Sequence, residues 1–407
     1  PPGLIYECKN ERYLQAATFK KSIDDGNQYF MIVNRRCSPY ISGGDNGGRR
    51  FIRVKFDANS TSFSGFNNWK IINLEDNSTV VTFDKQVNSL LDLGWYLPGE
   101  GKLFRLAPVM QEGGTLVADE SFGAVNFTCM DTVLKGGKNI TITGNTATIS
   151  FIDSATIIMN GGTFQSSDAA SGPQGPQKNT FQGVSGNKWR GLWLTNCSVK
   201  LYNSKFQDIK SDITGGRYAV NSVDCPLNDI RYNIFISPAS GGDTAGGVNI
   251  SYIDSSPLMI NSYVMYNTFT MNNSYSRAVQ VQSFAGLTAG TYVKGNTMTS
   301  NGNATGVFLS TITGGVVKQN SITNFSIGIN SLLSSVDIYG NTITNTVGIS
   351  RGIVGTASSS LNMAPSGNLW TGGFNITTNT SGNSKNVDVN NSVFTIGGGL
   401  NKFDVLY

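Results

Sequence analysis

The chain contains no histidine among its 407 residues. This absence excludes Ser-His-Asp and Cys-His catalysis, metal sites built on imidazole, and any general base of the imidazole type. Charge is also scarce, because only 14% of the residues are charged and the net charge is +4 without a long basic run. Nothing in this balance indicates nucleic-acid binding. An enzyme built from this chain would depend on carboxylate, Lys, Tyr or Arg chemistry.

Long hydrophobic runs are absent as well. No run of eighteen apolar residues occurs, so the sequence encodes no transmembrane helix. The chain starts at Pro1 without a signal-peptide pattern and ends soon after the run Gly397-Gly398-Gly399. We therefore expect it to be a mature or trimmed piece of something longer, truncated at its C-terminal end. A content of 39% apolar residues with 48 glycines is typical of a large folded protein and not of a disordered one.

A short pattern recurs through the last two thirds of the chain. It reads apolar-x-apolar-x-x-(Asn, Ser or Gly)-x-apolar, where x is any residue, as in Val336 to Ile343. Apart from the first interval, the copies are 21 to 34 residues apart, which predicts a solenoid of stacked coils. The Asn, Ser or Gly position, here called the anchor, falls at Gly162, Ser204, Asn233, Asn267, Asn296, Asn320, Asn341, Asn368 and Ser392.

A second strand-like segment precedes most anchors by roughly 13 to 18 residues, as at Gly328-Ile329 and Arg351-Gly352-Ile353. Each coil should therefore hold at least two short strands with apolar residues on alternate positions. Asn and Gly anchors suit a sharp bend because both tolerate left-handed backbone angles. Stacked Asn side chains would also hydrogen-bond in a ladder. We expect the anchors to stack at one corner of a solenoid over residues 110 to 400.

These coils resemble the right-handed parallel β-helix repeats of secreted bacterial proteins. The resemblance is carried by GNTIT (Gly340 to Thr344), KGNTMT (Lys294 to Thr299), KQNSIT (Lys318 to Thr323) and the segment Trp189 to Ile209. It covers about residues 110 to 400 and implies an architecture. It does not imply an activity, because polysaccharide lyases, glycosidases, phage tailspikes, adhesins and surface proteins all use this coil.

The first hundred residues lack the coil pattern. Strand-like runs such as Tyr29 to Val33, Phe51 to Phe56 and Trp69 to Leu74 alternate with turns rich in Gly, Asn, Asp and Ser. They predict a small antiparallel β-sandwich-like domain. The predicted fold class is all-β, with this domain at residues 1–108 and a parallel β-helix at residues 109–407.

Five cysteines give an odd count, and no Cys-x-x-Cys spacing predicts a zinc site. Cys8 and Cys37 are candidates for a disulfide if the protein is secreted. Cys197 and Cys225 precede consecutive anchors by seven and eight residues, so they should lie one coil apart. A buried pair of thiols fits them better than a bond. We expect no metal and no cofactor.

Acidic and basic residues concentrate in one part of the coil region: Asp208, Asp212, Asp224 and Asp229 with Lys205, Lys210, Arg217 and Arg231. This composition is similar to the acidic calcium site and basic residue of pectate lyases, but no motif of the β-helical glycosidases matches. A glycosidase needs two carboxylates about 5 to 10 Å apart. Asp224, Asp229 and Arg231 are therefore weak catalytic candidates, and surface salt pairing is the plainer interpretation.

Trp189 and Trp193 are candidate glycan contacts, with filling or capping of the coil interior as the alternative. Asp-Ser/Thr-apolar triplets resemble the O-glycosylation motif of Bacteroidota and give three candidate sites, Thr132, Ser154 and Thr244. Chance alone gives about three such triplets in a chain rich in Ser and Thr.

The order of segments looks most like the very large secreted surface proteins of Bacteroidota and related bacteria. Such proteins usually carry a C-terminal signal for type IX secretion, which is missing here. The resemblance implies a secreted or cell-surface location and, as partners, the bacterial secretion or outer-membrane surface machinery and a glycan or another surface protein.

We predict a non-catalytic adhesin, stalk or fibre component with a polar binding face. The alternatives are a polysaccharide lyase or glycoside hydrolase using carboxylates or an Arg/Lys base, and a phage tailspike-like fibre. The lack of histidine and the few acids favour the non-catalytic prediction.

Overall fold

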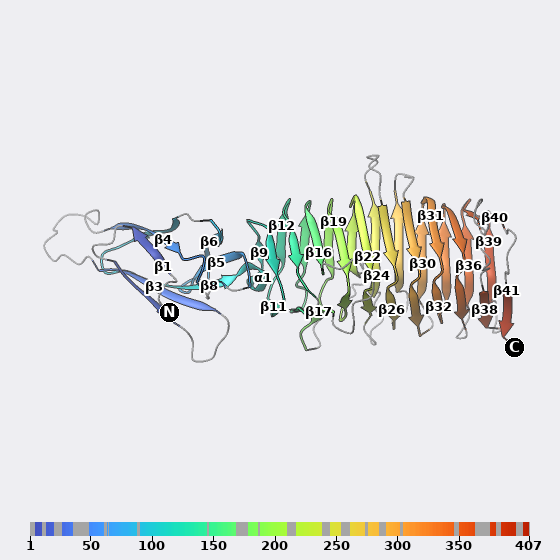
Figure 1. Cartoon of the computed structure of the whole chain (residues 1–407), viewed down its shortest axis with the longest axis horizontal. Helices are drawn as coiled ribbons and strands as arrows, with labels where there is room; N and C mark the ends of the chain where they lie inside the picture. Colours follow the sequence, from blue (N-terminus) through green and yellow to red (C-terminus); the bar gives the residue numbers. More distant parts are fainter. Residues whose placement is uncertain are drawn as a thin grey trace. The chain divides into compact units, whose positions relative to one another are not determined.

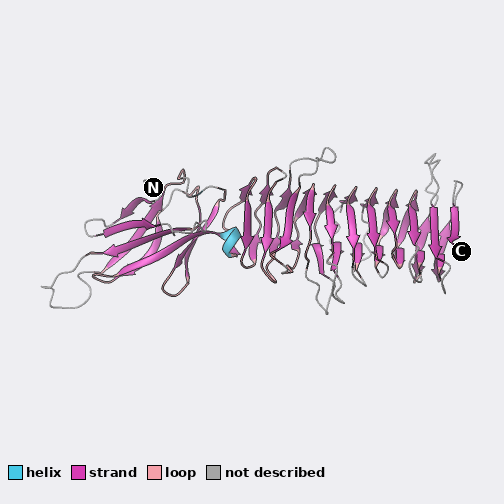
Figure 2. Cartoon of the chain, turned by 90° about the horizontal axis from the view of Figure 1, so that it is seen from below, coloured by secondary structure: helices cyan, strands magenta, loops and turns pink. Residues whose placement is uncertain are grey.

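The structure is a computed structural model. It describes residues 5–9, 14–19, 27–35, 49–60, 63, 65–87, 90–144, 146–167, 178–185, 188–209, 217–237, 245–253, 261–272, 276–284, 290–301, 304–345, 350–362, 375–379, 384–395 and 402–406. Strands dominate these residues, as Figure 2 shows, and one short helix, α1 (Val109–Glu112), occurs among them. The chain divides into two compact units. Unit 1 comprises residues 1–122 and 133–135, and unit 2 comprises residues 123–132 and 136–407.

Unit 1 contains two antiparallel sheets that enclose an aromatic core. One sheet has the order β1 (Ile5–Lys9), β4 (Arg50–Phe56), β7 (Leu91–Tyr96). The other has the order β2 (Leu14–Phe19), β3 (Gln28–Asn34), β8 (Gly101–Pro108), β5 (Asn68–Asn73), β6 (Thr79–Asp84). The ring of Phe30 from the second of these sheets lies 5.5 Å from that of Phe56 in the first. Edge-to-face contacts of this kind stabilise a core beyond the burial of apolar area.

Three long parallel sheets form the solenoid, and the chain visits them in turn, so that every third strand belongs to the same sheet. The first sheet contains β9 (Gly114–Thr115), β12 (Val133–Gly136), β15 (Ile157–Asn160), β18 (Leu192–Thr195), β21 (Arg217–Val223), β24 (Ala245–Tyr252), β27 (Arg277–Ser283), β30 (Thr305–Ser310), β33 (Ile327–Leu332), β36 (Arg351–Thr356) and β39 (Lys385–Asn390). The second contains β10 (Glu120–Phe122), β13 (Ile140–Ile142), β16 (Thr163–Ser166), β19 (Ser198–Tyr202), β22 (Leu227–Arg231), β25 (Asn261–Met265), β28 (Gly290–Lys294), β31 (Thr313–Lys318), β34 (Ser335–Tyr339), β37 (Ser360–Asn362) and β40 (Val393–Thr395). The third contains β11 (Asn126–Cys129), β14 (Thr148–Phe151), β17 (Asn179–Gly183), β20 (Ser204–Phe206), β23 (Ile234–Ile236), β26 (Thr268–Met271), β29 (Thr297–Ser300), β32 (Ser321–Thr323), β35 (Thr342–Asn345), β38 (Asn375–Asn379) and β41 (Lys402–Leu406).

Figure 1 shows strands such as β16, β19 and β22 side by side in chain order. The predicted fold class, a parallel β-helix preceded by a small antiparallel β-domain, is confirmed. The strand-like segments expected before the anchors, such as those ending at Ile329 and Ile353, all lie in the first sheet. Each coil has three strands, because the last apolar residue of the repeat belongs to a separate strand in the third sheet.

A row of phenylalanine side chains fills part of the interior of the solenoid. Along the third sheet the buried rings of Phe181, Phe206, Phe235 and Phe269 stack face to face at centroid distances of 4.8, 5.0 and 4.8 Å. The parallel register brings the same position of successive strands together, so each ring contacts the ring of the next coil. This stack forms a continuous apolar core through four coils.

Asparagine anchors form a hydrogen-bonded ladder at the corner between the second and third sheets. The backbone N–H and Nδ2 of Asn296 both donate to Oδ1 of Asn320, at 3.0 and 2.9 Å. Nδ2 of Asn296 also donates to the carbonyl of Val264 in the preceding coil, at 2.9 Å. The same arrangement links Asn233, Asn267, Asn296, Asn320 and Asn341 in order. Each amide is buried, and the ladder satisfies its donors and acceptor.

Two features of the anchors differ from expectation. At the asparagine anchors the left-handed residue is the one before the anchor, as at Tyr232 (φ 60°) and Gln319 (φ 56°), whereas the anchor Gly162 is itself left-handed (φ 79°). The expectation of one shared corner is wrong for Gly162 and Ser392, which lie between strands of the first and second sheets.

At that other corner, Oγ of Ser392 accepts from the N–H of Ser359 (3.1 Å), and Oγ of Ser359 accepts from the N–H of Ser334 (3.3 Å). At either corner, the backbone N–H groups in the bend between two short strands need a hydrogen-bond acceptor. The same spacing of apolar and small residues therefore occurs at both. Asn368 lies outside the described residues.

Candidate functional site

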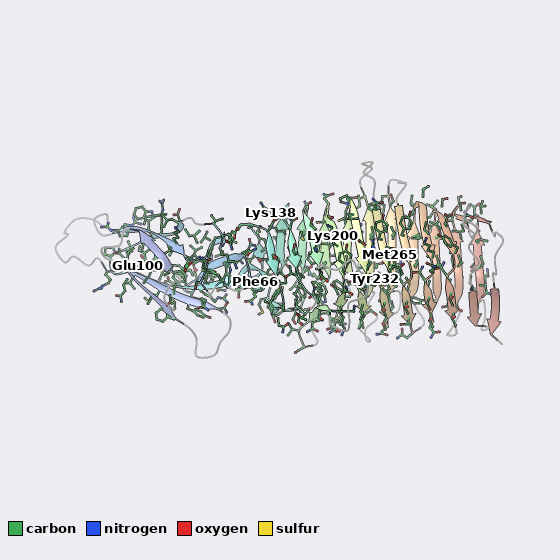
Figure 3. All side chains as sticks on the ribbon, viewed as in Figure 1. Phe66, Glu100, Lys138, Lys200, Tyr232 and Met265 are labelled. Atoms are coloured by element: carbon green, nitrogen blue, oxygen red, sulfur yellow. The ribbon has the colours of Figure 1, made fainter. Side chains whose placement is uncertain are left out.

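The outer face of the second sheet carries two rows of outward side chains. In β25 the residues Ser262 and Val264 are buried, while Tyr263 and Met265 point outward, as the pleat requires. Register then aligns the outward residues of successive coils. One row is Lys200, Asp229, Tyr263, Tyr292, Val316, Asp337 and Asn362, and the other is Tyr202, Arg231, Met265, Lys294, Lys318 and Tyr339. Figure 3 labels Lys200 and Met265, which belong to this face, and Tyr232, which follows β22 at the bend beside the sheet.

Tyrosine pairs stand on this face. The rings of Tyr263 and Tyr292 stack at 5.5 Å with an interplanar angle of 16°. A second pair, Tyr232 and Tyr266, lies at the bend beside the sheet and stacks at 5.4 Å and 10°. Because the rings face each other, their edges are turned to solvent. We call the surface formed by Arg231, Tyr232, Tyr263, Met265, Tyr266, Tyr292, Lys294 and Lys318, together with the buried ring of Tyr339 beside Lys318, the tyrosine–lysine face.

Glycine at position 295 permits the placement of Tyr266. Gly295 is left-handed (φ 64°), and a Cβ atom there would lie 2.6 Å from two atoms of the Tyr266 ring. Only a residue without a side chain allows the ring to approach the backbone this closely. Gly295 thus leaves room for the ring of Tyr266, which belongs to the preceding coil and covers the bend.

Cations sit over the rings of this face. Cζ of Arg231 lies 5.5 Å from the ring centroid of Tyr263, and Nζ of Lys294 lies 5.5 Å from that of Tyr266. Nζ of Lys318 lies 5.4 Å from the ring of Tyr339. Cation–π attraction at partly exposed sites is worth about 0.5–1 kcal/mol, which orients the ammonium groups without neutralising them.

Asp229 and Arg231, two of the weak catalytic candidates, form an ion pair through Nε of Arg231 and Oδ1 of Asp229. The other oxygen, Oδ2, accepts a hydrogen bond from the hydroxyl of Tyr202 at 2.8 Å. Burial, together with this bond to a carboxylate, raises the pKa of Tyr202. A tyrosine with a raised pKa is a poor general base at neutral pH. The arrangement of Asp229, Arg231 and Tyr202 is therefore suited to a structural ion pair with a supporting hydrogen bond.

Asp224, the third weak candidate, lies elsewhere. It follows β21 in the left-handed conformation (φ 50°), and its Oδ1 accepts from the N–H of Ile253 at 2.7 Å. Among the rest of the ionic cluster, burial raises the pKa of Asp208. Lys210, Asp212 and the side chain of Arg217 lie outside the described residues.

The two tryptophans have different surroundings. Trp189 is fully buried and stacks on Phe151 at 4.4 Å, while its Nε1 donates to the carbonyl of Gln207 at 2.7 Å. The candidate glycan contact is wrong for Trp189, because the apolar interior takes its ring. Trp193 is half-buried in β18 and its Nε1 donates to the carbonyl of Arg190 at 3.0 Å. A role of Trp193 in glycan contact stays a prediction.

Three further sets of candidates can be placed. Thr132 and Ser154 are half-buried residues between strands, and Thr244 lies outside the described residues. Cys129, Cys197 and Cys225 are buried free thiols, and the N–H of Cys197 donates to Sγ of Cys225 at 3.2 Å. The structure describes neither the Cys8 side chain nor Cys37. In the described part of the chain, no three His, Cys, Asp or Glu side chains gather where they would hold a metal ion.

Reasoning from the repeat missed the tyrosine–lysine face. Its signal is present in the printed sequence, since Tyr263 and Tyr292 occupy the position between the two inward residues of the repeat, Ser262 and Val264 in one copy and Thr291 and Val293 in the other. Comparing that position between coils would have shown a tyrosine pair beside Lys294 and Lys318. No helix among the described residues is long and apolar enough to cross a membrane. Comparison with protein-family models, curated proteins and solved structures found no match.

Proposed function

We propose that the chain is a non-catalytic extracellular β-helix protein, a rigid stalk or adhesive element at a cell surface, which binds its partner through the tyrosine–lysine face. A secreted or cell-surface location and contact with the bacterial surface machinery form part of this proposal. The observation that supports it best is the combination of stacked tyrosines with cations that have no catalytic arrangement around them.

Rigidity supports the role of a stalk. The backbone of each coil is hydrogen-bonded to its neighbours through three sheets, and the asparagine ladder ties the corner between two of them. Outward side chains consequently keep a fixed spacing of about 4.8 Å from coil to coil. A surface held this way is preorganised, so little conformational entropy is lost when it binds.

The carboxylates argue against hydrolysis or elimination. The carboxylate of Asp229 already pairs with Arg231 and accepts a hydrogen bond from Tyr202, and the carboxylate of Asp224 accepts one from the backbone N–H of Ile253. A glycosidase needs one carboxyl group to donate a proton and a second to attack or to activate water. Neither aspartate is free for such a role in this arrangement.

Binding to an array of surface polysaccharides and surface proteins tests the proposal. The double variant Tyr263→Ala/Tyr292→Ala should lose binding, because it removes the stacked pair on the second sheet. The matched control is Thr268→Ala/Thr297→Ala, an exposed pair in the same register on the third sheet. Equal binding by both variants would show that the tyrosine–lysine face is not the binding surface.

The same preparation should release neither reducing ends nor unsaturated products from the polysaccharides on the array. Product formation that is lost in Asp229→Asn or Tyr202→Phe would replace the proposal with a polysaccharide lyase or hydrolase.

A further inference from the structure

We propose that Lys294 and Lys318 form an anion-binding site on the tyrosine–lysine face, and that this site binds a carboxylated or sulfated polysaccharide. The inference rests on the proposed function, because it names the ligand class of the same face.

Uncompensated positive charge is the first observation. Lys294 and Lys318 are direct register partners on neighbouring strands, β28 and β31, and both point outward. Like charges directly opposite each other in a sheet are destabilising. Neither ammonium has a carboxylate within salt-bridge distance in the part of the chain that the structure describes. An anion bound between them would remove this repulsion.

Each ammonium is held over an aromatic ring, that of Lys294 by the preceding coil and that of Lys318 by the following coil. Tyr266 lies beneath the ammonium of Lys294, and Tyr339 lies beneath that of Lys318. Both lysine stems are half-buried along the sheet. Aliphatic stems that pack on the surface leave the charged heads in solvent, where a ligand can reach them. The pair is thus partly ordered before any ligand arrives.

The row continues beyond the two lysines. Met265 and then Arg231 precede Lys294 in the same register, and Arg231 is ion-paired with Asp229. The parallel row provides the edges of Tyr263 and Tyr292 for hydrogen bonds and apolar contact with sugar rings. A polymer lying along the solenoid would meet one coil every 4.8 Å or so, which is comparable to the length of one pyranose unit.

The geometry favours a polysaccharide over an acidic peptide. An extended peptide is usually captured by adding a strand to a sheet edge. β28 and β31 are interior strands, hydrogen-bonded to neighbours on both sides, so they offer no edge here. What the face offers is side chains alone: hydroxyl groups, ring edges and ammonium groups. These are the groups that recognise sugars carrying carboxylate or sulfate.

The experiment measures the affinity of the whole chain for four probes: polygalacturonate, dextran sulfate, neutral dextran and poly-glutamate. Lys294→Gln/Lys318→Gln should weaken the binding of a charged polysaccharide about tenfold or more and flatten its salt dependence. Lys294→Arg/Lys318→Arg should retain most of the affinity. The control, Lys138→Gln/Lys385→Gln, removes two lysine charges from exposed positions elsewhere in unit 2, of which Lys385 is ion-paired with Asp388, and should bind like the unaltered chain.

Three outcomes would overturn the inference, and they separate it from the proposed function. Binding of neutral dextran that needs Tyr263 and Tyr292 but not the lysines would refute the anionic ligand and keep the binding face. Poly-glutamate binding as tightly as the charged polysaccharides would refute the polysaccharide class. If neither the probes nor the surface array bind at all, the proposed function itself fails.

Discussion

Replacing Asn320 by Leu tests the asparagine ladder most directly, because leucine preserves the shape of the side chain and removes all of its hydrogen bonds. Asn320 accepts from the N–H and Nδ2 of Asn296, and its own Nδ2 donates to Asn341 and to the carbonyl of Val293. The substitution leaves the buried N–H of Asn296 without its acceptor and takes one bond from each of the other groups. A buried unsatisfied group costs about 1–3 kcal/mol, so the total loss should be about 2–4 kcal/mol.

Repeat proteins need not unfold in a single step, so a local probe is more direct than a melting temperature. Hydrogen exchange followed by mass spectrometry should show faster exchange in the peptide containing Asn296 and Asn320, and urea should unfold unit 2 at a lower concentration. Asn160→Leu, the same chemical change at an exposed position, is the control and should shift stability by less than about 0.5 kcal/mol. If Asn320→Leu behaved like this control, the ladder would not stabilise the solenoid.

Three further predictions follow from the packing. Phe206→Ala should destabilise unit 2 by about 3–5 kcal/mol in urea titration, because it opens a cavity within the ring stack, whereas the exposed Phe284→Ala should change little. Gly295→Ala should cost about 1–3 kcal/mol and weaken ligand binding, since its Cβ displaces Tyr266; unchanged binding would contradict the packing. The buried thiols should resist iodoacetamide until urea unfolds the protein. Burial raises the pKa of Cys129, and hydrogen bonding with Cys225 together with burial raises that of Cys197; peptide mapping that finds either labelled in the native state would contradict this.

The sequence predicted the solenoid because its repeat reports a local requirement that every coil shares. An apolar pair and a bend residue must recur wherever two short strands meet at a corner, so Asn296, Asn320 and Asn341 were assigned to one corner correctly. The same requirement exists at the next corner, and therefore the spacing alone did not separate Ser392 from them. Periodicity reports which side chains point inward, but it cannot tell which of two corners a bend occupies.

No short sequence motif reveals the candidate site, because its members are far apart in sequence and are common residue types; only a comparison of the same repeat position between coils brings them together. Lys294 and Lys318 are 24 residues apart, and each lies beside an ordinary anchor. Only the parallel register makes them neighbours. The weak ionic candidates illustrate the opposite case. Asp224 and Asp229 are close in sequence, yet the first lies at a bend after β21 and the second within β22, so closeness along the chain did not produce a shared site.

The asparagine ladder and the tyrosine–lysine face are linked by register. Coils differ in length, since the ladder anchors from Asn233 to Asn341 lie 21 to 34 residues apart, and without a fixed point the outward rows would drift out of alignment. A ladder in which each Oδ1 must accept from the amide of the preceding coil permits only one register at that corner. Extra residues must then lie in the connections between strands. Tyr263, Tyr292 and the two lysines are therefore aligned along the solenoid by a buried corner that no ligand would contact, and a substitution in the ladder should disturb binding without touching the face.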